Sequence, residues 1–481
     1  MEVSKMSGST STARQRIESL LDENSFVEIG ALVCARSTDF NLKQVDTPSD
    51  GVITGYGVIN DNLVYVYSQD ASVLNGSVGE MHARKIANLY DMALKMGAPV
   101  IGLIDSTGLR LQEATDALNG LGQIYQKQAL CSGVIPQITA IFGSCGGGLA
   151  ILPGLADFTF METKSHLFVN APNAICGNSE DKCDTSAAAF QSEESGNADF
   201  VCDEAEIYGK IRELVSFLPA NNEEEADGAI TNDDLNRASN TAAACYKDAA
   251  LALTDIADDN QFIEFKANYG KDMVAGFIKL DGMTVGCVAN RSVIYDENGK
   301  EAEKFDEVLS VNGCVKAAEF INFCDAFSIP VLSLTNVTGF KACKCAEKRI
   351  ARAVSKLTYA FANATVPKVN VVLEKAFGSA YVAMNSKALG CDVTFAWEDA
   401  QIGTMDAKNA AKIMYDGEAA DVVAAKAGEY ASLQESAMSA AKRGYVDYII
   451  KPEDTRKYVI GAFEMLYSKN EDRPAKKHGT V

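Results

Sequence analysis

The chain is poor in histidine. His82, His166 and His478 are the three histidines among 481 residues, and His478 lies in the polar stretch "RPAKKHGTV". Histidine is the commonest acid–base group near neutral pH. Because so few are present, we expect chemistry that depends on oriented hydrogen-bond donors rather than on a side-chain proton shuttle.

The chain also lacks closely paired metal-binding cysteines. Thirteen cysteines are scattered along it, and the one close pair is Cys343-x-Cys345. Since no C-x-x-C pair occurs, the spacing excludes a zinc ribbon or a thioredoxin-type motif. We predict no metal site, and we expect most thiols to be small core residues.

Long apolar runs and basic residues are scarce as well. No run of 18 apolar residues occurs, and the N-terminal stretch lacks the apolar core of a signal peptide, so we predict no membrane span and a cytoplasmic protein. Lys and Arg total 44 against 65 Asp and Glu, for a net charge of −21. This charge disfavours nucleic-acid binding but permits a local site for a phosphorylated cofactor.

The sequence that is present repeats itself as α/β units. The first half predicts a hairpin, a helix, a buried strand, a second helix and a second strand, over residues 51–70, 79–97, 98–108, 114–133 and 134–143. The second half predicts the same order over residues 275–292, 314–328, 329–339, 349–364 and 365–380. This order indicates two related α/β domains.

The two halves keep one register. Five pairs of identical residues lie 231 positions apart. They are Pro99 and Pro330, Thr107 and Thr338, Gly108 and Gly339, Pro136 and Pro367, and Gly147 and Gly378. Between the halves, residues 218–240 are rich in Asn, Asp and Glu, which is typical of a surface linker. We therefore predict domains at 1–230 and 231–481.

The glycine-rich stretch "IFGSCGGGLAILPG", residues 141–154, follows a predicted strand. It lacks the Lys of a P-loop, the spacing of a Rossmann fingerprint and the G-x-S-x-G pattern of a hydrolase. Adjacent glycine N–H groups can stabilise a developing oxyanion, whereas the alternative is close helix–strand packing. "AFGSAY" in the second half has the same register, which favours two oxyanion sites, and Cys145 is expected to be a buried thiol.

Several longer motifs resemble a known family. They include "SQDASVLNGSVGEMHARKI", "KAFGSAYVAMNSKALGCDVTFAW" and "AQIGTMDAK". They resemble the acyl-CoA carboxyltransferase subunits of biotin-dependent enzymes, of the propionyl-CoA carboxylase β-chain type, over nearly the whole chain. The resemblance implies two tandem crotonase-like domains of the ClpP/crotonase superfamily. It also implies a hexamer whose active sites lie between the N-domain of one chain and the C-domain of another.

The resemblance implies a role for each glycine turn. In the N-terminal domain, on the acyl-CoA side, Gly147 and Gly148 would hold the thioester oxygen as an enolate forms. In the C-terminal domain, on the biotin side, Ser379 and Ala380 would hold the ureido oxygen of biotin beside Gly378. The ureido nitrogen would then take the α-proton, which would explain the scarcity of histidine.

Contacts to the coenzyme are expected from four cationic side chains. His82, Arg84 and Lys85 in "HARK" and Arg110 in "DSTGLR" are the candidates for binding coenzyme A, although a solvated or interface helix face fits the "HARK" residues somewhat better. His166 is expected to be a hydrogen-bonded strand residue, and Trp397 a core residue.

The implied activity is carboxyl transfer between biotin on a separate carrier protein and the α-carbon of an acyl-CoA. The partner would be a biotin carboxylase for the forward reaction, with acetyl- or propionyl-CoA. A membrane decarboxylase subunit would be the partner for the reverse reaction, with methylmalonyl-, malonyl- or glutaconyl-CoA, and would place the chain at a membrane. A crotonase-type hydratase or isomerase and a noncatalytic scaffold are further alternatives.

The chain departs from the family pattern near both turns. Leu109 is bulkier than the usual residue, Ser379 replaces a glycine, and Val382 replaces an aspartate. The loop "TGFKACK" replaces a Pro-Gly-Phe-Leu-Pro-Gly turn and is one residue shorter. These changes leave the acyl group that is accepted undetermined.

Overall fold

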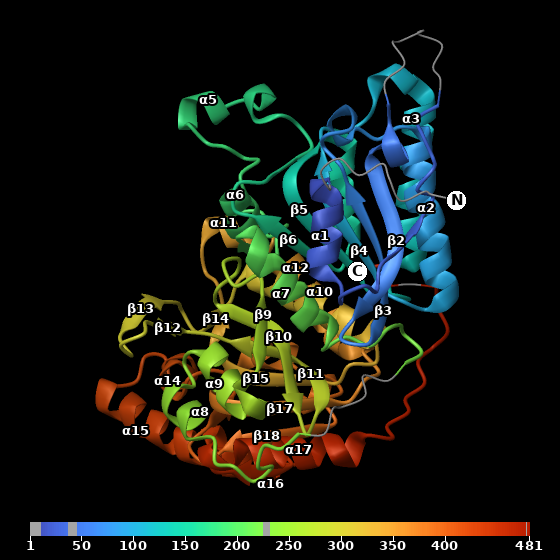
Figure 1. Ribbon diagram of the computed structural model, residues 1–481. Coiled ribbons are helices and arrows are strands. Elements are labelled where there is room, and N and C mark those ends of the chain that lie inside the picture. Colours follow the sequence, from blue (N-terminus) through green and yellow to red (C-terminus); the bar gives the residue numbers. More distant parts are fainter. Residues whose placement is uncertain (1–10, 37–45, 225–230, 478) are drawn as a thin grey trace. The chain divides into compact units, whose positions relative to one another are not determined.

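The computed structural model describes residues 11–36, 46–224, 231–477 and 479–481. His478 and part of the predicted linker, 225–230, lie outside these residues. The chain forms two compact units, Met1–Glu225 and Ala226–Val481, and the predicted α/β class is confirmed in each (Figure 1). Among the described helices, none has both the length and the apolar character needed to cross a membrane.

The first unit contains an eight-stranded sheet in the order β1-β2-β3-β4-β5-β6-β8, with β7 paired to β5. Strands β1 to β3 are antiparallel, and β3 to β6 and β8 are parallel. The strands are β1 (Val27–Ile29), β2 (Val52–Ile59), β3 (Asn62–Gln69), β4 (Val100–Ser106), β5 (Gln137–Gly146), β6 (Phe158–Glu162), β7 (His166–Phe168) and β8 (Phe200–Cys202). The helices are α1 (Thr12–Leu20), α2 (Glu80–Met96), α3 (Ala114–Cys131), α4 (Ile151–Leu155), α5 (Asn178–Asp181), α6 (Ala188–Glu193) and α7 (Glu204–Val215).

The second unit repeats this sheet as β9-β10-β11-β15-β17-β18-β20, with β19 paired to β17. Its strands are β9 (Phe262–Phe265), β10 (Met273–Leu280), β11 (Met283–Asn290), β12 (Val293–Tyr295), β13 (Glu301–Lys304), β14 (Val308–Leu309), β15 (Val331–Val337), β16 (Gly339–Phe340), β17 (Lys368–Phe377), β18 (Val393–Trp397), β19 (Gln401–Gly403) and β20 (Tyr448–Ile450). Its helices are α8 (Asn240–Cys245), α9 (Ala249–Ile256), α10 (Val311–Ala326), α11 (Lys344–Glu347), α12 (Ile350–Asn363), α13 (Gly378–Ala383), α14 (Ala407–Met414), α15 (Ala420–Tyr430), α16 (Ala437–Lys442) and α17 (Thr455–Leu466).

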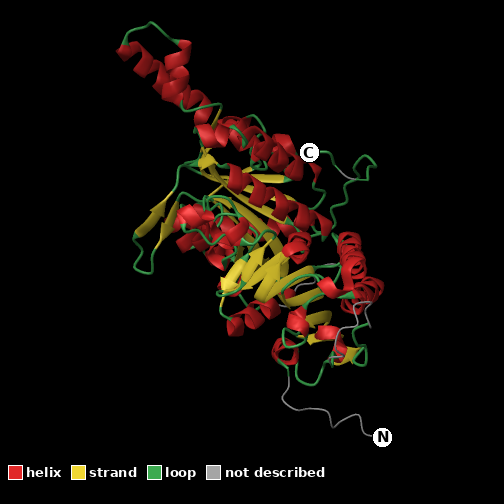
Figure 2. Cartoon of the chain, turned by 90° about the horizontal axis from the view of Figure 1, so that it is seen from above, coloured by secondary structure: helices red, strands yellow, loops and turns green. Residues whose placement is uncertain are grey.

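Both units cover a mainly parallel sheet with paired helices. In the first unit α2 packs against α3, and in the second α10 packs against α12, as Figure 1 shows. Figure 2 shows the strands of the sheets lying between helices. Parallel strands covered in this way are apolar along most of their length, and β4 and β15 are buried almost throughout. In each sheet a glycine turn lies at the carboxyl end of the neighbouring parallel strand, β5 or β17.

Local sequence explains the hairpins that begin each unit. Asn60 and Asp61 have φ of +49° and +67°, and Asp281 and Gly282 have φ of +51° and +76°. A two-residue loop with positive φ at both positions is a type I′ turn, which matches the twist of the flanking strands. Asn, Asp and Gly adopt this conformation most readily, so the predicted hairpins are confirmed.

Aspartates fix where the central strands begin. Asp157, just before β6, accepts a hydrogen bond from the Gln137 N–H of β5 at 2.8 Å. Asp392, just before β18, accepts one from the Lys368 N–H of β17, also at 2.8 Å. The backbone N–H of each aspartate donates back to its partner strand. The same reciprocal pair therefore sets the register of both sheets.

Candidate active site

The first glycine turn lies where β5 ends. Gly147 has φ of +63°, a left-handed conformation that favours glycine, and no heavy atom lies within 4 Å of the position that its Cβ would occupy. Gly147 and Gly148 are half-buried and begin the 3₁₀ turn Gly147–Ala150. The first N–H groups of such a turn have no partner inside it. The turn can therefore present these donors to a ligand.

Helix α3 holds this turn in place. The Tyr125 hydroxyl donates a hydrogen bond to the Gly148 carbonyl. A Cβ on Gly148 would lie 2.9 Å from Leu121 Cδ2 and 3.1 Å from the Tyr125 hydroxyl. Close packing and donor presentation therefore occur together, because glycine permits both at this position.

The second turn lies at the same place in the second unit. Strand β17 ends at Phe377, and Gly378 has φ of +62°, almost the value at Gly147. Helix α13 then begins, with Ser379 exposed and Ala380 buried. Each turn follows a ten-residue strand, β5 or β17. The two donor sites thus have the same backbone construction.

The strand beside each turn shares an irregularity. The pairing of β4 with β5 shifts between Ile104 and Ser106, and that of β15 with β17 shifts between Thr335 and Val337. The residue at the shift donates its N–H to a side-chain oxygen, from Asp105 to Gln69 and from Asn336 to Asn290, each at 3.2 Å. These two hydrogen bonds therefore give the carboxyl ends of β4 and β15 the same local geometry.

Asp105 also packs directly against the chain that leads to the first turn. A Cβ on Gly143 would lie 2.1 Å from Asp105 Oδ1, so only glycine fits there. Arg16 of α1 lies 3.1 Å from Asp105 Oδ2 and 4.6 Å above the ring of Phe142. Arg16 thus holds the Asp105 carboxylate, which packs against Gly143 and thereby helps to fix the end of β5.

His82 lies inside the first unit and does not face solvent. Its Nδ1–H donates to the Asp50 carbonyl at 2.9 Å, and its Nε2 accepts from the Gln69 amide at 3.1 Å. Burial, followed by the charge of Arg110, lowers the pKa of His82 to about 3. Gln69 also accepts a hydrogen bond from the Asp105 N–H. The neutral His82 ring therefore connects α2, through Gln69, to the end of β4.

Arg110 is buried in a closed set of partners. Its Nη1 lies 2.7 Å from both Asp50 Oδ1 and Glu113 Oε1, and its Nη2 donates to the Ser77 carbonyl at 2.8 Å. Burial raises the pKa of Asp50, while Arg110 opposes this rise. The contacts of Arg110 hold two carboxylates within the fold and leave no exposed guanidinium for a coenzyme phosphate.

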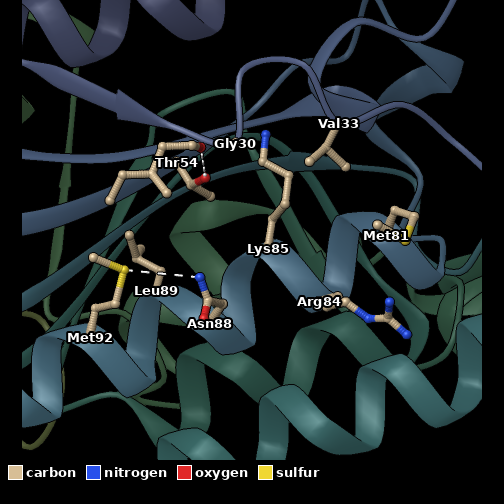
Figure 3. A pocket seen from close by; sticks show the side chains of 10 residues that line it. Gly30, Val33, Thr54, Met81, Arg84, Lys85, Asn88, Leu89 and Met92 are labelled. Carbon is tan, nitrogen blue, oxygen red and sulfur yellow. Dashed lines mark hydrogen bonds between the residues drawn. The ribbon is translucent and has the colours of Figure 1, made fainter.

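Lys85 is buried beside a hollow of about 250 Å³ (Figure 3). Its Nζ donates to the carbonyls of Ser49 and Val52, and burial lowers the pKa of Lys85 to about 8. A Cβ on Gly30 would lie 3.2 Å from Lys85 Cε. The amine therefore points at backbone that precedes and begins β2.

Lys316 repeats this arrangement in the second unit, 231 residues later. Its Nζ donates to the carbonyls of Lys266 and Tyr269 at 2.8 and 3.1 Å, and burial lowers the pKa of Lys316 to about 8. The same clamp in both units indicates a structural role for Lys85. The offset of 231 residues between Lys85 and Lys316 is a sequence signal that could have indicated this structural role.

Arg84 is the member of the "HARK" trio that faces solvent. Its side chain is 62% exposed, pairs with Glu80 at 2.9 Å and points away from Lys85 (Figure 3). The alternative of a solvated helix face fits Arg84 alone, because His82 and Lys85 lie on the buried face of α2. Arg84 is thus the one predicted coenzyme ligand whose charged group is open to solvent.

The remaining singled-out residues have ordinary structural roles. Cys145 is fully buried, and burial raises the pKa of its thiol well above the usual range. His166 lies in β7, with Nδ1 at 2.9 Å from the Ser186 hydroxyl. Trp397 is buried and donates to the Thr455 hydroxyl at 3.0 Å. The expectations for these three residues are confirmed.

Two duplicated α/β units, each ending its central strand in a left-handed glycine turn, define a crotonase-like enzyme. The carboxyl transferase domain family matches residues 5–481, and the chain belongs to this family of biotin-dependent acyl-CoA carboxyltransferases. The predicted family, fold and activity are therefore confirmed. The chain is a carboxyltransferase that uses biotin and a coenzyme A thioester.

Relatives of known name extend over nearly the whole chain. The methylmalonyl-CoA decarboxylase subunit alpha of Propionigenium modestum is 39% identical, over 98% of this chain and 93% of that protein. The propionyl-CoA carboxylase beta chain of Roseobacter denitrificans is 38% identical, over 98% of this chain and 93% of that one. The transcarboxylase 12S subunit, solved as a hexamer with methylmalonyl-coenzyme A bound, matches with a TM-score of 0.91 and 38% identity, over 98% and 92% of the two chains.

Proposed function

We propose that this chain moves a carboxyl group between biotin on a separate carrier protein and the α-carbon of a short acyl-CoA, with propionyl-CoA and methylmalonyl-CoA as the pair. The observation that carries the proposal is the pair of left-handed glycines, Gly147 and Gly378, at the ends of equivalent strands. Carboxyl transfer of this kind needs two carbonyl oxygens to be held. Relatives named for methylmalonyl-CoA and propionyl-CoA support the choice of substrate.

The turn of the first unit would bind the thioester. The N–H groups of Gly147 and Gly148 would donate to the thioester oxygen, whose negative charge grows as an enolate forms. Donors that are already oriented stabilise such charge without reorganising, and one of them contributes roughly 3–4 kcal/mol. Tyr125 would support catalysis indirectly, because it fixes the Gly148 carbonyl.

The turn of the second unit would bind biotin. The N–H groups of Ser379 and Ala380, which follow Gly378, would donate to the ureido oxygen. The exposed Ser379 shows that a side chain fits at this position, so the replacement of the usual glycine is compatible with the role. Carboxybiotin, when bound, supplies the carboxyl group and a ureido nitrogen as proton acceptor. A side-chain base is not needed, which agrees with the low pKa and burial of His82.

We assign the coenzyme contact to Arg84. Its guanidinium is exposed, and its i,i+4 pair with Glu80 is weak enough to be replaced by a phosphate. His82, Lys85 and Arg110 would instead keep α2 and the strand ends in position. Each of these three already makes hydrogen bonds to groups within the unit.

The direction of transfer would be set by the partner proteins. A biotin carboxylase partner would drive carboxylation of propionyl-CoA, and a membrane decarboxylase subunit would draw the reaction toward decarboxylation. Relatives of both kinds have nearly equal identity, 39% and 38%. We propose a cytoplasmic hexamer, by analogy with the hexameric transcarboxylase 12S, that receives biotin from a carrier.

One experiment tests the activity. The purified chain is incubated with methylmalonyl-, malonyl- or glutaconyl-CoA and free biotin, and the decarboxylated thioester is measured by chromatography. Methylmalonyl-CoA is expected to react fastest. No turnover of any thioester, with or without a biotinylated carrier, would contradict the proposal, and faster turnover of another thioester would correct the substrate.

A further inference from the structure

Two cysteine sulfurs lie together where α11 begins, with Cys343 at its N-cap and Cys345 in its first turn. Cys343 Sγ and Cys345 Sγ are 2.8 Å apart, with Cys345 exposed and Cys343 partly exposed. Seven of the thirteen cysteines are buried. The pair is thus placed where a small molecule in solution can reach both sulfurs.

The surroundings of Cys343 favour its thiolate. A hydrogen bond from the Cys345 thiol, followed by one from the Ala346 N–H, lowers the pKa of Cys343. Lys341 contributes in the same direction through its charge. Burial has the opposite effect elsewhere and raises the pKa of Cys131 to about 11. Since the thiolate is the reactive form, Cys343 differs chemically from the buried cysteines.

We propose that Cys343 and Cys345 are a dithiol–disulfide site that reacts with low-molecular-weight disulfides such as glutathione disulfide. The Cys343 thiolate attacks one sulfur of glutathione disulfide, which forms a mixed disulfide and releases one glutathione thiolate. The Cys345 thiolate, after losing its proton to solvent, then attacks Cys343 Sγ and releases the second glutathione. The protein loses two electrons and two protons, and one glutathione disulfide becomes two glutathiones.

The geometry makes the second step easy. The sulfurs are already in contact and need to approach to about 2.05 Å to bond. A disulfide between residues only two positions apart at an exposed site is expected to be readily reduced again. We therefore expect a reversible modification that follows the ratio of glutathione disulfide to glutathione, rather than a permanent structural bond.

Peptide mapping tests the chemistry. The full chain is reduced, freed of reductant, equilibrated with glutathione disulfide, alkylated and digested with trypsin, which cuts after Lys341, Lys344 and Lys348. In the oxidised protein, residues 342–344 and 345–348 are expected to stay joined by a bond between Cys343 and Cys345. In the reduced protein the two peptides are expected separately, each alkylated.

Two variants sharpen the test. Cys345→Ser is expected to stop at the mixed disulfide on Cys343, whereas Cys176→Ser, at another exposed cysteine, is expected to leave the joined peptide unchanged. Full alkylation of both cysteines in the treated wild type would overturn the proposal. Resistance to alkylation without a joined peptide would also overturn it and would indicate a bound soft metal ion.

The dithiol site follows a strand that contacts the element of the second glycine turn. Strand β16 contacts α13, which carries that turn, and Cys343 follows β16 by three residues. This expectation rests on the proposed function: oxidation should lower the rate of carboxyl transfer by about tenfold, since small misplacements of groups near the reacting atoms lower rates by up to about 100-fold. Unchanged activity in a sample with the joined peptide would overturn this coupling alone, and the double variant Cys343→Ser/Cys345→Ser is expected not to respond.

Discussion

At the residue scale, single left-handed glycines mark the two turns to which we assign the oxyanion sites. Gly147 is left-handed and faces open space, whereas most glycines of the strands, such as Gly143, are needed because a neighbour is close. Alanine in a left-handed conformation costs roughly 1–2 kcal/mol. A substitution at Gly147 therefore shifts the donors or strains the turn, without filling a packed interior.

For Gly147→Ala we expect kcat to fall by about 100-fold, because displaced groups near the reacting atoms lose that much. The control is Gly444→Ala, where φ is +79° and the Cβ position is also empty. Steady-state kinetics with methylmalonyl-CoA, together with thermal unfolding, measures both variants. Equal loss of kcat in the two variants would assign the effect to backbone strain alone and remove Gly147 from the site.

Arg110 and Arg84 are expected to respond in opposite ways to replacement by methionine. Arg110→Met leaves Asp50 and Glu113 buried without a cation, so the free energy of unfolding should fall by about 3–5 kcal/mol. Arg84→Met should change stability by less than about 0.5 kcal/mol and raise KM for the acyl-CoA two- to fivefold, the equivalent of roughly 0.5–1 kcal/mol. Urea unfolding and kinetics measure these effects, and a stable Arg110→Met with a raised KM would reverse the assignment.

At the element scale, paired strands are positioned by buried groups at their ends. Asp157 and Asp392 make the same backbone contact before β6 and β18, but their surroundings differ. Burial, with a smaller contribution from Asp199, raises the pKa of Asp157 to about 7. Asp392 instead has Lys469 at 2.8 Å. The same strand start therefore has different charged neighbours in the two units.

Asp157 should make the first unit less stable as pH rises. Its folded-state pKa lies above the unfolded value near 4, so its stabilisation is complete below pH 4 and is lost as pH rises toward 7. From pH 5 to pH 7, the wild type should lose about 2 kcal/mol relative to Asp157→Asn. Asp392→Asn, the matched change in the second unit, should cost about 1–3 kcal/mol, because Lys469 loses one of its two carboxylate partners. Urea unfolding at several pH values measures both, and a rise in wild-type stability relative to Asp157→Asn would contradict the assignment.

At the scale of the whole molecule, the net charge of −21 opposes assembly. Like charges on identical subunits repel one another, and salt screens this repulsion. If the chain forms the proposed hexamer through largely apolar contacts, sedimentation at low chain concentration should show more hexamer at 0.5 M than at 0.05 M salt. Dissociation at high salt would instead indicate an interface held by ion pairs.

Much of the fold could be predicted from the sequence because its signals are local. The hairpin turns, the buried strands and the amphipathic helices each depend on residues within a short window, and Gly147 and Gly378 were identified by their shared register. The environment of the cations could not be predicted in this way. Asp50 and Glu113 lie 60 and 3 residues from Arg110, and only the fold brings all three together.

The duplicated α/β architecture, the two glycine turns and the family can be predicted from the chain order, because repeats, periodicity and motifs are properties of that order. Which charged groups are exposed to a ligand depends on the folded structure. His82, Arg84 and Lys85 lie within four residues, yet two are buried and one is exposed. The physical reason is that burying a polar group is favourable only when distant residues supply its hydrogen bonds, and those partners are brought into place only when the chain folds.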